Sequence, residues 1–420
     1  MEEFLKRRDK LFDLLEDGSV AIIYAGAAKI SSEDEYFPFL ANRHFFYLTG
    51  IEQENSILML IKSVGERKSY LFLDEYDERK ERWTGKRLSF DKAAEISQMS
   101  NIYSNSTFKS MLDMAVKQKM YGNIKYLYLD LSDELKVGLN SSTKTVAKEM
   151  EIEYQDIQVL DIYKLIASLR MVKSDLEVSY LEEAANNTNN GINDLLIQMH
   201  LGMHEHELSD RFEYYGKTHG RRELSFDTIV ATGIDATILH HPIAQQEKAI
   251  EEGELILFDL GYKYKGYCAD ISRTFPVNGV FSDYQKKVYQ AVLTCNKEVI
   301  KYIKPGLKIS DLQDYAKEVL KHEAVKYGLM KEDEDISKYY IHNVSHFLGL
   351  DTHDCGDRNT PLVPGNVITV EPGLYFVETG TGVRIEDDVL VTEGEAIVLS
   401  RGIVKEIKDI EKLLKTKRRA

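Results

Sequence analysis

Residues 255–275 read LILFDLGYKYKGYCADISRTF, and this stretch predicts a β-hairpin. Asp259 lies at the end of an apolar run, although aspartate is disfavoured in strands. A turn at Lys265 and Gly266 would bring Asp270 nearly opposite Asp259, by the pairing geometry of antiparallel strands. Two carboxylates that close repel each other unless a proton or a cation lies between them. The hairpin therefore indicates either a cation-binding pair or two solvated carboxylates at strand ends.

A cluster of histidines lies further along the chain. Residues 342–354 read HNVSHFLGLDTHD and contain His342, His346 and His353. A single histidine here would be an ordinary core or surface residue, but three within twelve positions favour a functional site. The pattern lacks the HExxH order of a zincin helix, so we do not predict that helix.

Two glutamates and an arginine follow the histidines. Glu371 ends a strongly β-forming run, and Pro372 holds it in an extended conformation. Arg384 and Glu386 are two positions apart in a predicted strand, so both side chains point to the same face. These residues add two carboxylates and a cation to the same half of the chain.

Taken together, these patterns supply two aspartates, two glutamates and a histidine. A donor set that is rich in oxygen and has one imidazole suits Mn²⁺, and also Co²⁺ or Zn²⁺, better than metals that prefer thiolates. Four carboxylates balance the charge of two divalent ions, and a two-metal site can hold a bridging hydroxide. The residues alone therefore predict a di-metal hydrolase.

Composition limits the other classes of function. The 420 residues include 54 Lys and Arg against 69 Asp and Glu, a net charge of −15 that argues against nucleic-acid binding. No apolar run approaches the ~18 residues of a membrane span. The first residues are charged throughout and lack the apolar region of a signal peptide. Three cysteines without CxxC spacing suit a reducing compartment, so we expect a cytoplasmic protein with no membrane contact.

The pattern of predicted elements divides the chain in two. Strands and helices alternate from residue 19 to about 160, with Phe45–Thr49 among the predicted strands, which is typical of an α/β domain. The pattern changes at about 165–172, where a serine or aspartate begins a long helix. Helices are then predicted at 174–199, 206–219, 283–302 and 310–327. We expect domains at 1–168 and 169–420.

Several motifs resemble the pita-bread metallopeptidases, and among them aminopeptidase P. These motifs are LFDLG (257–261), KGYCADISRTFPVNG (265–279), HNVSHFLGLDTHD (342–354), VEPGLY (370–375) and GVRIEDD (382–388). The N-terminal half, with SSEDEYFPFLANRHFFYLTG (31–50) and RWTGKRL (82–88), resembles the N-terminal domain of aminopeptidase P, and LRMVKSDLEV (169–178) resembles its interdomain segment. The resemblance implies an α+β protein with an N-terminal RNase-H-like α/β domain and a C-terminal pita-bread domain, a curved antiparallel sheet backed by helices.

The resemblance also implies a ligand set for two metal ions, most often Mn²⁺. The five implied ligands, in chain order, are Asp259, Asp270, His346, Glu371 and Glu386. In this family a metal-bridging water or hydroxide attacks the carbonyl before proline, and the position of Glu371 also shuttles a proton. His342, Tyr375 and Arg384 match positions around the proline pocket. Trp83 matches an aromatic residue that reaches a neighbouring active site in tetrameric relatives, although an ordinary core or surface role is equally open.

Two non-ligand histidines of the family match His240 and His353, which would orient the substrate and stabilise oxyanion charge. The family usually has one histidine followed by an aromatic residue or glycine where this chain has His240, His241 and Pro242. We assign the role to His240, because the run before it is preserved. His241 is the alternative.

The leading expectation is an aminopeptidase that releases the N-terminal residue from peptides with proline in the second position. Proline has no N–H and a fixed φ, so general peptidases stall on it. A prolidase, which cuts only Xaa-Pro dipeptides with the same metal site, is the close alternative. A non-catalytic protein on the same scaffold would be expected to have lost ligands. The resemblance also implies a homodimer or homotetramer.

Overall fold

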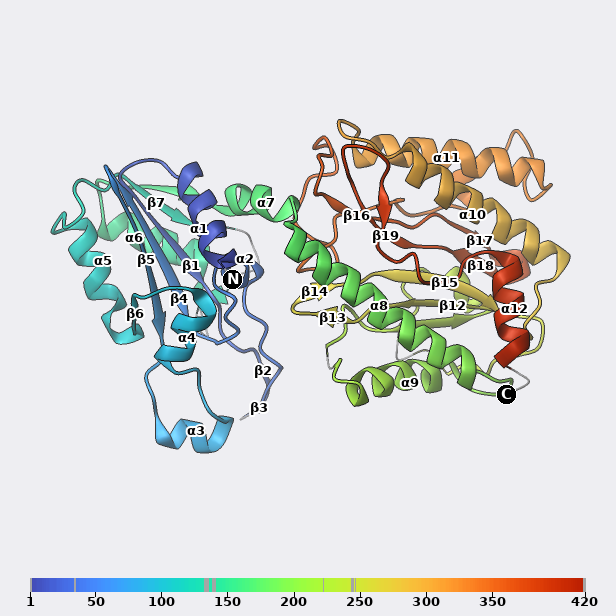
Figure 1. The fold of residues 1–420 in the computed structure, drawn as a ribbon, viewed down its shortest axis with the longest axis horizontal. Coiled ribbons are helices and arrows are strands. Elements are labelled where there is room, and N and C mark those ends of the chain that lie inside the picture. The colour runs from blue at the N-terminus through green and yellow to red at the C-terminus, as the bar shows by residue number, and fades with distance from the viewer. Residues whose placement is uncertain are drawn as a thin grey trace. The chain divides into compact units, whose positions relative to one another are not determined.

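The computed structural model describes residues 2–33, 35–131, 136–137, 141–221, 223–242, 245 and 247–417. The chain forms two compact units, Met1–Arg170 and Met171–Ala420 (Figure 1), which confirms the predicted two-domain architecture. Among the described residues, no helix is both long and apolar enough to cross a lipid bilayer.

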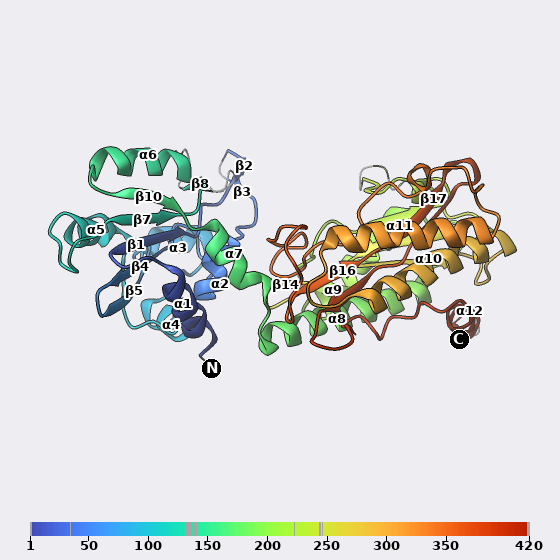
Figure 2. The same cartoon turned by 90° about the horizontal axis from the view of Figure 1, so that it is seen from above.

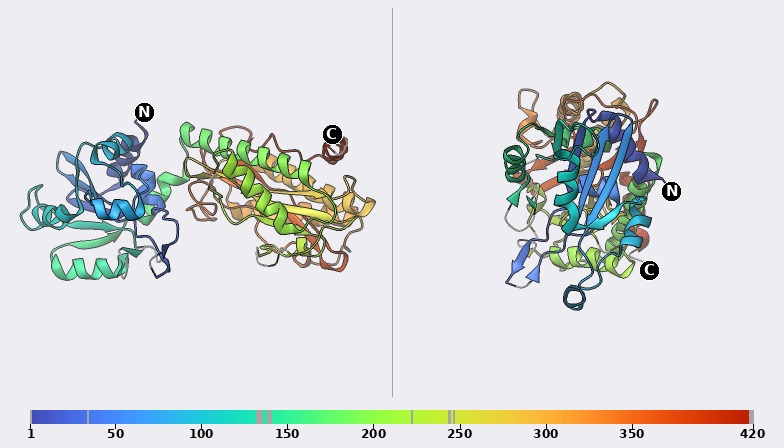
Figure 3. Two further views of the ribbon diagram at one scale, coloured as in Figure 1. Left: turned by 90° about the horizontal axis from the view of Figure 1, so that it is seen from below. Right: turned by 90° about the vertical axis from the view of Figure 1, so that its left-hand side faces the viewer.

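A mixed six-stranded sheet organises the N-terminal unit. Its strands, in spatial order, are β10 (Gln158–Asp161), β7 (Tyr126–Leu129), β1 (Ser19–Tyr24), β4 (Ile57–Ser63), β5 (Glu66–Leu73) and β6 (Ile102–Ser104). Strand β1 is fully buried between an antiparallel neighbour, β4, and a parallel one, β7. The right-hand view of Figure 3 shows these strands side by side. The remaining described elements of this unit are α1 (Glu3–Leu14), β2 (Ile30–Ser32), β3 (Glu35–Tyr36), α2 (Arg43–Thr49), α3 (Glu78–Thr84), α4 (Phe90–Ser97), α5 (Phe108–Val116), β8 (Lys136–Val137), β9 (Ser141–Ser142), α6 (Thr143–Glu153) and α7 (Tyr163–Met171).

The predicted strand at Phe45–Thr49 is wrong, because these residues belong to helix α2. The Asn42 side chain accepts hydrogen bonds from the backbone N–H groups of His44 and Phe45 and so caps the helix. Gly50 ends it in the left-handed conformation. A short run of aromatic residues fits a strand by composition, but the cap residues on both sides specify a helical turn.

Helices enclose the strands of the second unit. They are α8 (Asp175–Gln198), α9 (Glu205–Thr218), α10 (Asp283–Tyr302), α11 (Ile309–Lys326) and α12 (Ile407–Lys417). The four long helices lie where the sequence predicts them. Ser174 and Ser282 each form a capping box at the start of α8 and α10, which fixes where these helices begin. Helices α8 and α9 pack side by side in Figure 3, and α10 and α11 in Figure 2.

Short antiparallel sheets line the interior of this unit. One joins β11 (Ile229–Thr232), β12 (Leu255–Leu260) and β15 (Ile271–Pro276), and another joins β16 (Val367–Val370), β19 (Asp387–Leu390) and β20 (Ile397–Val398). Two-stranded pairs link β13 (Lys263–Tyr264) to β14 (Tyr267–Cys268) and β17 (Gly373–Phe376) to β18 (Thr381–Arg384). Apolar residues from strands β11, β12 and β15 to β18 and from the helices form the largest described core cluster of this unit.

The predicted hairpin turn forms between β13 and β14. Lys265 and Gly266 have φ values of 52° and 85°, the two positive values that a tight hairpin turn requires. Asp259 pairs with Ser272, two residues after Asp270, so the hairpin brings the two aspartates to the same end of the sheet.

Candidate active site

The two hairpin aspartates are buried and face different partners. Asp259 Oδ2 accepts a hydrogen bond of 2.6 Å from Nη2 of Arg384 on β18. Its other oxygen, Oδ1, is buried without a hydrogen-bond partner among the described residues. Asp270 Oδ2 lies 3.2 Å from Nε2 of His346. The Asp259 carboxylate therefore has a free acceptor oxygen in the interior, which suits a cation.

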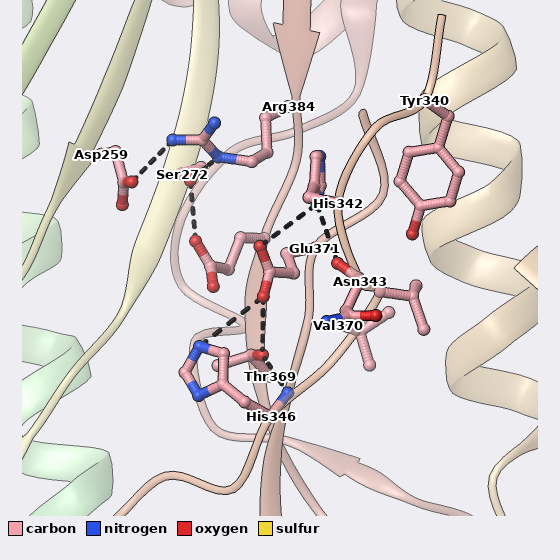
Figure 4. A network of polar contacts seen from close by, with 12 residues as sticks. Asp259, Ser272, Tyr340, His342, Asn343, His346, Thr369, Val370, Glu371 and Arg384 are labelled. Atoms are coloured by element: carbon pink, nitrogen blue, oxygen red, sulfur yellow. Dashed lines mark hydrogen bonds and ion pairs between the residues drawn. The ribbon is translucent and has the colours of Figure 1, made fainter. Parts of the chain in front are cut away.

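His346 points its Nε2 atom into the same cluster. Its Nδ1 atom lies 3.0 Å from the carbonyl oxygen of Phe347, a contact that fixes the ring and leaves Nε2 free to act as a ligand. Nε2 lies 3.6 Å from Oε1 of Glu371, and Figure 4 shows the two side chains pointing toward each other. The Thr369 hydroxyl contacts both the His346 N–H and the Glu371 carboxylate.

Glu386 completes the carboxylate cluster from the segment between β18 and β19. The Ser272 hydroxyl donates to Glu386 Oε2 at 2.7 Å, and the Glu386 N–H donates to the Ser272 carbonyl oxygen at 3.0 Å. Ligand atoms of Asp270, His346 and Glu386 lie within 4.8 Å of one another, close enough to share one metal ion. The structure thus brings all five predicted ligands into one cluster.

A buried ion network supports the Glu386 backbone from behind. Arg273 is fully buried, donates to the Glu386 carbonyl oxygen and pairs with Asp387 at 2.6 Å. Lys405 contacts the other Asp387 oxygen, and although burial opposes it, these two cations hold the pKa of Asp387 well below its usual range. Sequence reasoning missed this network, because Arg273 and Asp387 are 114 positions apart in the chain and no local pattern links them.

The carboxylates carry strongly perturbed pKa values. Burial raises the pKa of Asp259 to about 6, with Asp270 adding to the shift and Arg384 opposing it. Burial raises the pKa of Glu371 to about 7, and that of Glu386 well above its usual range. Crowded buried carboxylates of this kind are stabilised by cations, so the donor set fits divalent metal ions.

His346 responds to the same carboxylates. Burial would lower its pKa, but the hydrogen bond to Asp270 and the charge of Glu371 raise the pKa of His346 to about 9. A proton on the imidazole would partly neutralise the charge of these carboxylates, as a divalent cation would.

His342, Tyr375 and Arg384 form a connected group beside the carboxylates. His342 Nε2 lies 2.8 Å from the Tyr375 hydroxyl, which accepts from Arg384 Nη1 at 3.2 Å. Arg384 also donates to the Ser272 hydroxyl at 2.7 Å and to Asp259 (Figure 4). Burial and the Arg384 charge lower the pKa of His342 to about 3, so its ring is neutral at pH 7.

A cavity of about 590 Å³ opens onto this cluster. Asp259, Asp270, His240, His241 and His353 are among its lining residues. The His353 ring meets the His346 ring edge-on at 4.4 Å between centroids. His240 is exposed, whereas only 2% of His241 is accessible to solvent. The geometry favours His240 as the histidine that meets a bound molecule.

Trp83 lies on α3 in the other unit, and 79% of its surface is exposed. This exposure excludes a core role for Trp83 and leaves an ordinary surface role open. Its predicted role beside a neighbouring active site stays a prediction.

Two family models match the chain. Metallopeptidase family M24 matches residues 179–393, and the aminopeptidase P N-terminal domain matches residues 4–124. The Xaa-Pro aminopeptidases of Escherichia coli and Haemophilus influenzae are 32% and 31% identical, and each alignment covers 98% of this chain and 97% of the relative.

Solved structures give the same result. A structure described as aminopeptidase P from Bacillus anthracis is 39% identical, with a TM-score of 0.94 over 99% of this chain and 98% of that one. E. coli aminopeptidase P with the inhibitor Pro-Leu is 30% identical, with a TM-score of 0.90 over 100% of this chain and 99% of that one.

Proposed function

This chain belongs to metallopeptidase family M24, and on that premise we propose that it is an Xaa-Pro aminopeptidase. It removes the N-terminal residue from peptides that have proline in the second position. The observation that carries the proposal is the cluster of four carboxylates, three of them buried, and His346 beside an open cavity, with an unpartnered oxygen on Asp259 among the described residues.

We propose that two divalent ions are held by Asp259, Asp270, His346, Glu371 and Glu386. Mn²⁺ is the preferred metal, because oxygen ligands dominate, and Co²⁺ or Zn²⁺ are alternatives. When bound, such ions supply Lewis-acid activation of water and of the scissile carbonyl.

The other side chains have separate proposed roles. Glu371, whose Oε1 atom lies 3.6 Å from His346 Nε2 in the ligand cluster, is suited to accept a proton from the attacking water and to pass it to the leaving proline nitrogen. His240 and His353 line the cavity and donate hydrogen bonds to the charge that develops on the carbonyl oxygen. His342, Tyr375 and Arg384 hold the proline side of the substrate.

Three further properties belong to this proposal. The functional boundary lies near residue 168, so that 169–420 form the catalytic domain. The enzyme acts in the cytoplasm, because its three cysteines, which lack CxxC spacing, suit a reducing compartment. It assembles as a homodimer or homotetramer, and its partners are peptides with an Xaa-Pro N-terminus.

A paired assay tests the function. The same Xaa-Pro sequence is supplied as a dipeptide and as a tripeptide, with Mn²⁺ added, and the released N-terminal residue is quantified. We expect cleavage of the tripeptide with little cleavage of the dipeptide. Cleavage of the dipeptide alone would show a prolidase, and cleavage of neither would refute the substrate class.

Two variants test the site. Asp259→Asn and His346→Ala should each abolish cleavage and lower the metal content measured by mass spectrometry. The matched control is His322→Ala, which changes an exposed histidine on α11 and should leave both properties unchanged. Full activity of either site variant would contradict the proposed ligands.

A further inference from the structure

The segment between β11 and β12 carries His240 to the cavity, and both of its ends are fixed. The Gly233 N–H donates to the Leu255 carbonyl oxygen at 3.0 Å. The Glu205 N–H donates to the Lys248 carbonyl oxygen at 3.1 Å. The segment is therefore bonded to β12 at one end and to the start of α9 at the other.

The residues on each side of His240 are also held. Leu239 packs against a small buried apolar cluster that includes Ala236 and Tyr375. On the other side, His241 is buried. His240 itself is exposed, and it lies within electrostatic reach of Asp259, His342 and His353. Its position in the cavity is thus set by its two neighbours in the chain.

Glu205, at the first turn of α9, is the partner of His241. Its side chain is fully buried, and its Oε2 lies 3.0 Å from His241 Nε2. Its Oε1 accepts from the backbone N–H of Thr232 and from the Thr232 hydroxyl, the latter at 2.8 Å. Thr232 ends β11, the strand whose Ile229 pairs with Asp259. One carboxylate therefore ties the His240 segment to the strand beside a predicted ligand.

Asp235 lies close to this pair, so Glu205, Asp235 and His241 could together approach a metal ion. The contacts argue against a metal there, because both Glu205 oxygens already accept hydrogen bonds, two from Thr232 and one from the His241 ring. Burial raises the pKa of Glu205, and these donors are what stabilise its charge. The cluster has the properties of a hydrogen-bonded anchor.

We propose that Glu205 and His241 are positioning residues, which hold His240 at the distance from the metal cluster that catalysis requires. The inference rests on the proposed function, since His240 is the group that meets the substrate.

Two substitutions of His241 separate its hydrogen bond from its bulk. His241→Phe keeps a ring but removes the donor to Glu205, whereas His241→Gln keeps a donor at a similar reach. We expect His241→Phe to lower kcat about 10- to 100-fold, because a displacement near 1 Å costs that much, with KM changed less than threefold. The kcat of His241→Gln should lie much closer to that of the wild type. Glu205→Gln changes the other partner of this hydrogen bond and should also lower kcat. His322→Phe, at an exposed position, is the control.

A coupling experiment separates positioning from a general structural defect. If His241 acts through His240, then adding His241→Phe to a His240→Ala enzyme should lower kcat less than twofold. A loss in that background equal to the loss in the wild type would overturn the proposal.

Hydrogen exchange gives a readout that does not depend on activity. Peptides covering residues 234–242 should exchange faster in His241→Phe and Glu205→Gln than in the wild type, with no change in β12. Unchanged exchange in both variants would refute the proposal that Glu205 and His241 hold this segment in place. An inactive wild type would refute the proposed function instead, and the exchange result would still decide whether His241 holds the segment.

Discussion

A methyl group at residue 261 should separate the two hairpin aspartates. Gly261 follows Asp259 by two positions, and a Cβ atom there would lie 1.9 Å from the carbonyl oxygen of Ala269, the residue before Asp270. Contacts below 3.0 Å do not occur, so the Ala269 peptide must move by about 1 Å. A backbone carbonyl cannot rotate away as a flexible side chain can. The movement is therefore transmitted to Asp270.

The expected loss is large, because a misplacement of 1 Å costs about 100-fold in rate. Gly261→Ala should lower kcat/KM for an Xaa-Pro tripeptide by about that factor at saturating Mn²⁺. Steric overpacking should also lower the free energy of unfolding by about 1–3 kcal/mol. The assays are steady-state kinetics, metal content after dialysis, and urea denaturation.

Gly402→Ala is the matched control, because its Cβ would meet the Asn189 side chain at an ordinary 3.4 Å. It should change kcat/KM less than twofold. If Gly261→Ala kept activity within threefold of the wild type and bound the same amount of metal, the spacing of the aspartates would not depend on this contact.

Three other predictions concern metal and buried charge. Dialysis against a chelator should abolish cleavage and lower the Tm measured by calorimetry. Adding Mn²⁺ at 100 times its Kd should raise the free energy of unfolding by about 2.7 kcal/mol per site. Full activity after verified metal removal would contradict the mechanism. In the metal-free protein, burial is the main cause that raises the pKa of Glu371 to about 7. The protonated side chain therefore contributes to the free energy of unfolding fully below about pH 4.5, and this contribution is lost as the pH rises through 7. Relative to Glu371→Gln, the wild type should lose about 3 kcal/mol between pH 4.5 and 8 in urea denaturation, and parallel curves would refute this. Arg273→Met leaves the buried Asp387 with Lys405 as its remaining cation, and should cost about 3–5 kcal/mol. The exposed Arg401→Met should cost less than about 1 kcal/mol, and equal losses would show that burial of the pair does not matter.

Local patterns in the sequence were sufficient for most elements of the fold. The turn at Lys265 and Gly266 and the cap at Ser174 are short-range signals, and the structure has these elements as predicted. The wrong prediction at Phe45–Thr49 has a local cause as well, because the aromatic composition is typical of a strand, whereas the caps at Asn42 and Gly50 specify a helix. The choice between helix and strand in a run of five residues depends on such ends.

The candidate site was predictable where the chemistry of a residue conflicts with its surroundings. Asp259 at the end of an apolar strand is such a case, and the structure places it in one cluster with the other expected ligands, whose assignment stays a prediction. The choice between His240 and His241 depends on burial, which adjacent identical residues do not reveal. Glu205 and Arg273 act across long separations along the chain, so no local pattern marked them.

Lys173 has a consequence for dissecting the chain. Its Nζ atom lies 3.2 Å from Oδ2 of Asp354, which follows His353 directly, and both side chains are about 1% exposed. Its N–H also donates to the Gly365 carbonyl oxygen at 2.8 Å. A truncated catalytic fragment that began at the capping Ser174 would lack this lysine and its ion pair with a buried carboxylate beside the site. A fragment that keeps this ion pair has to start at Lys173 or earlier, although every predicted ligand lies after Ser174.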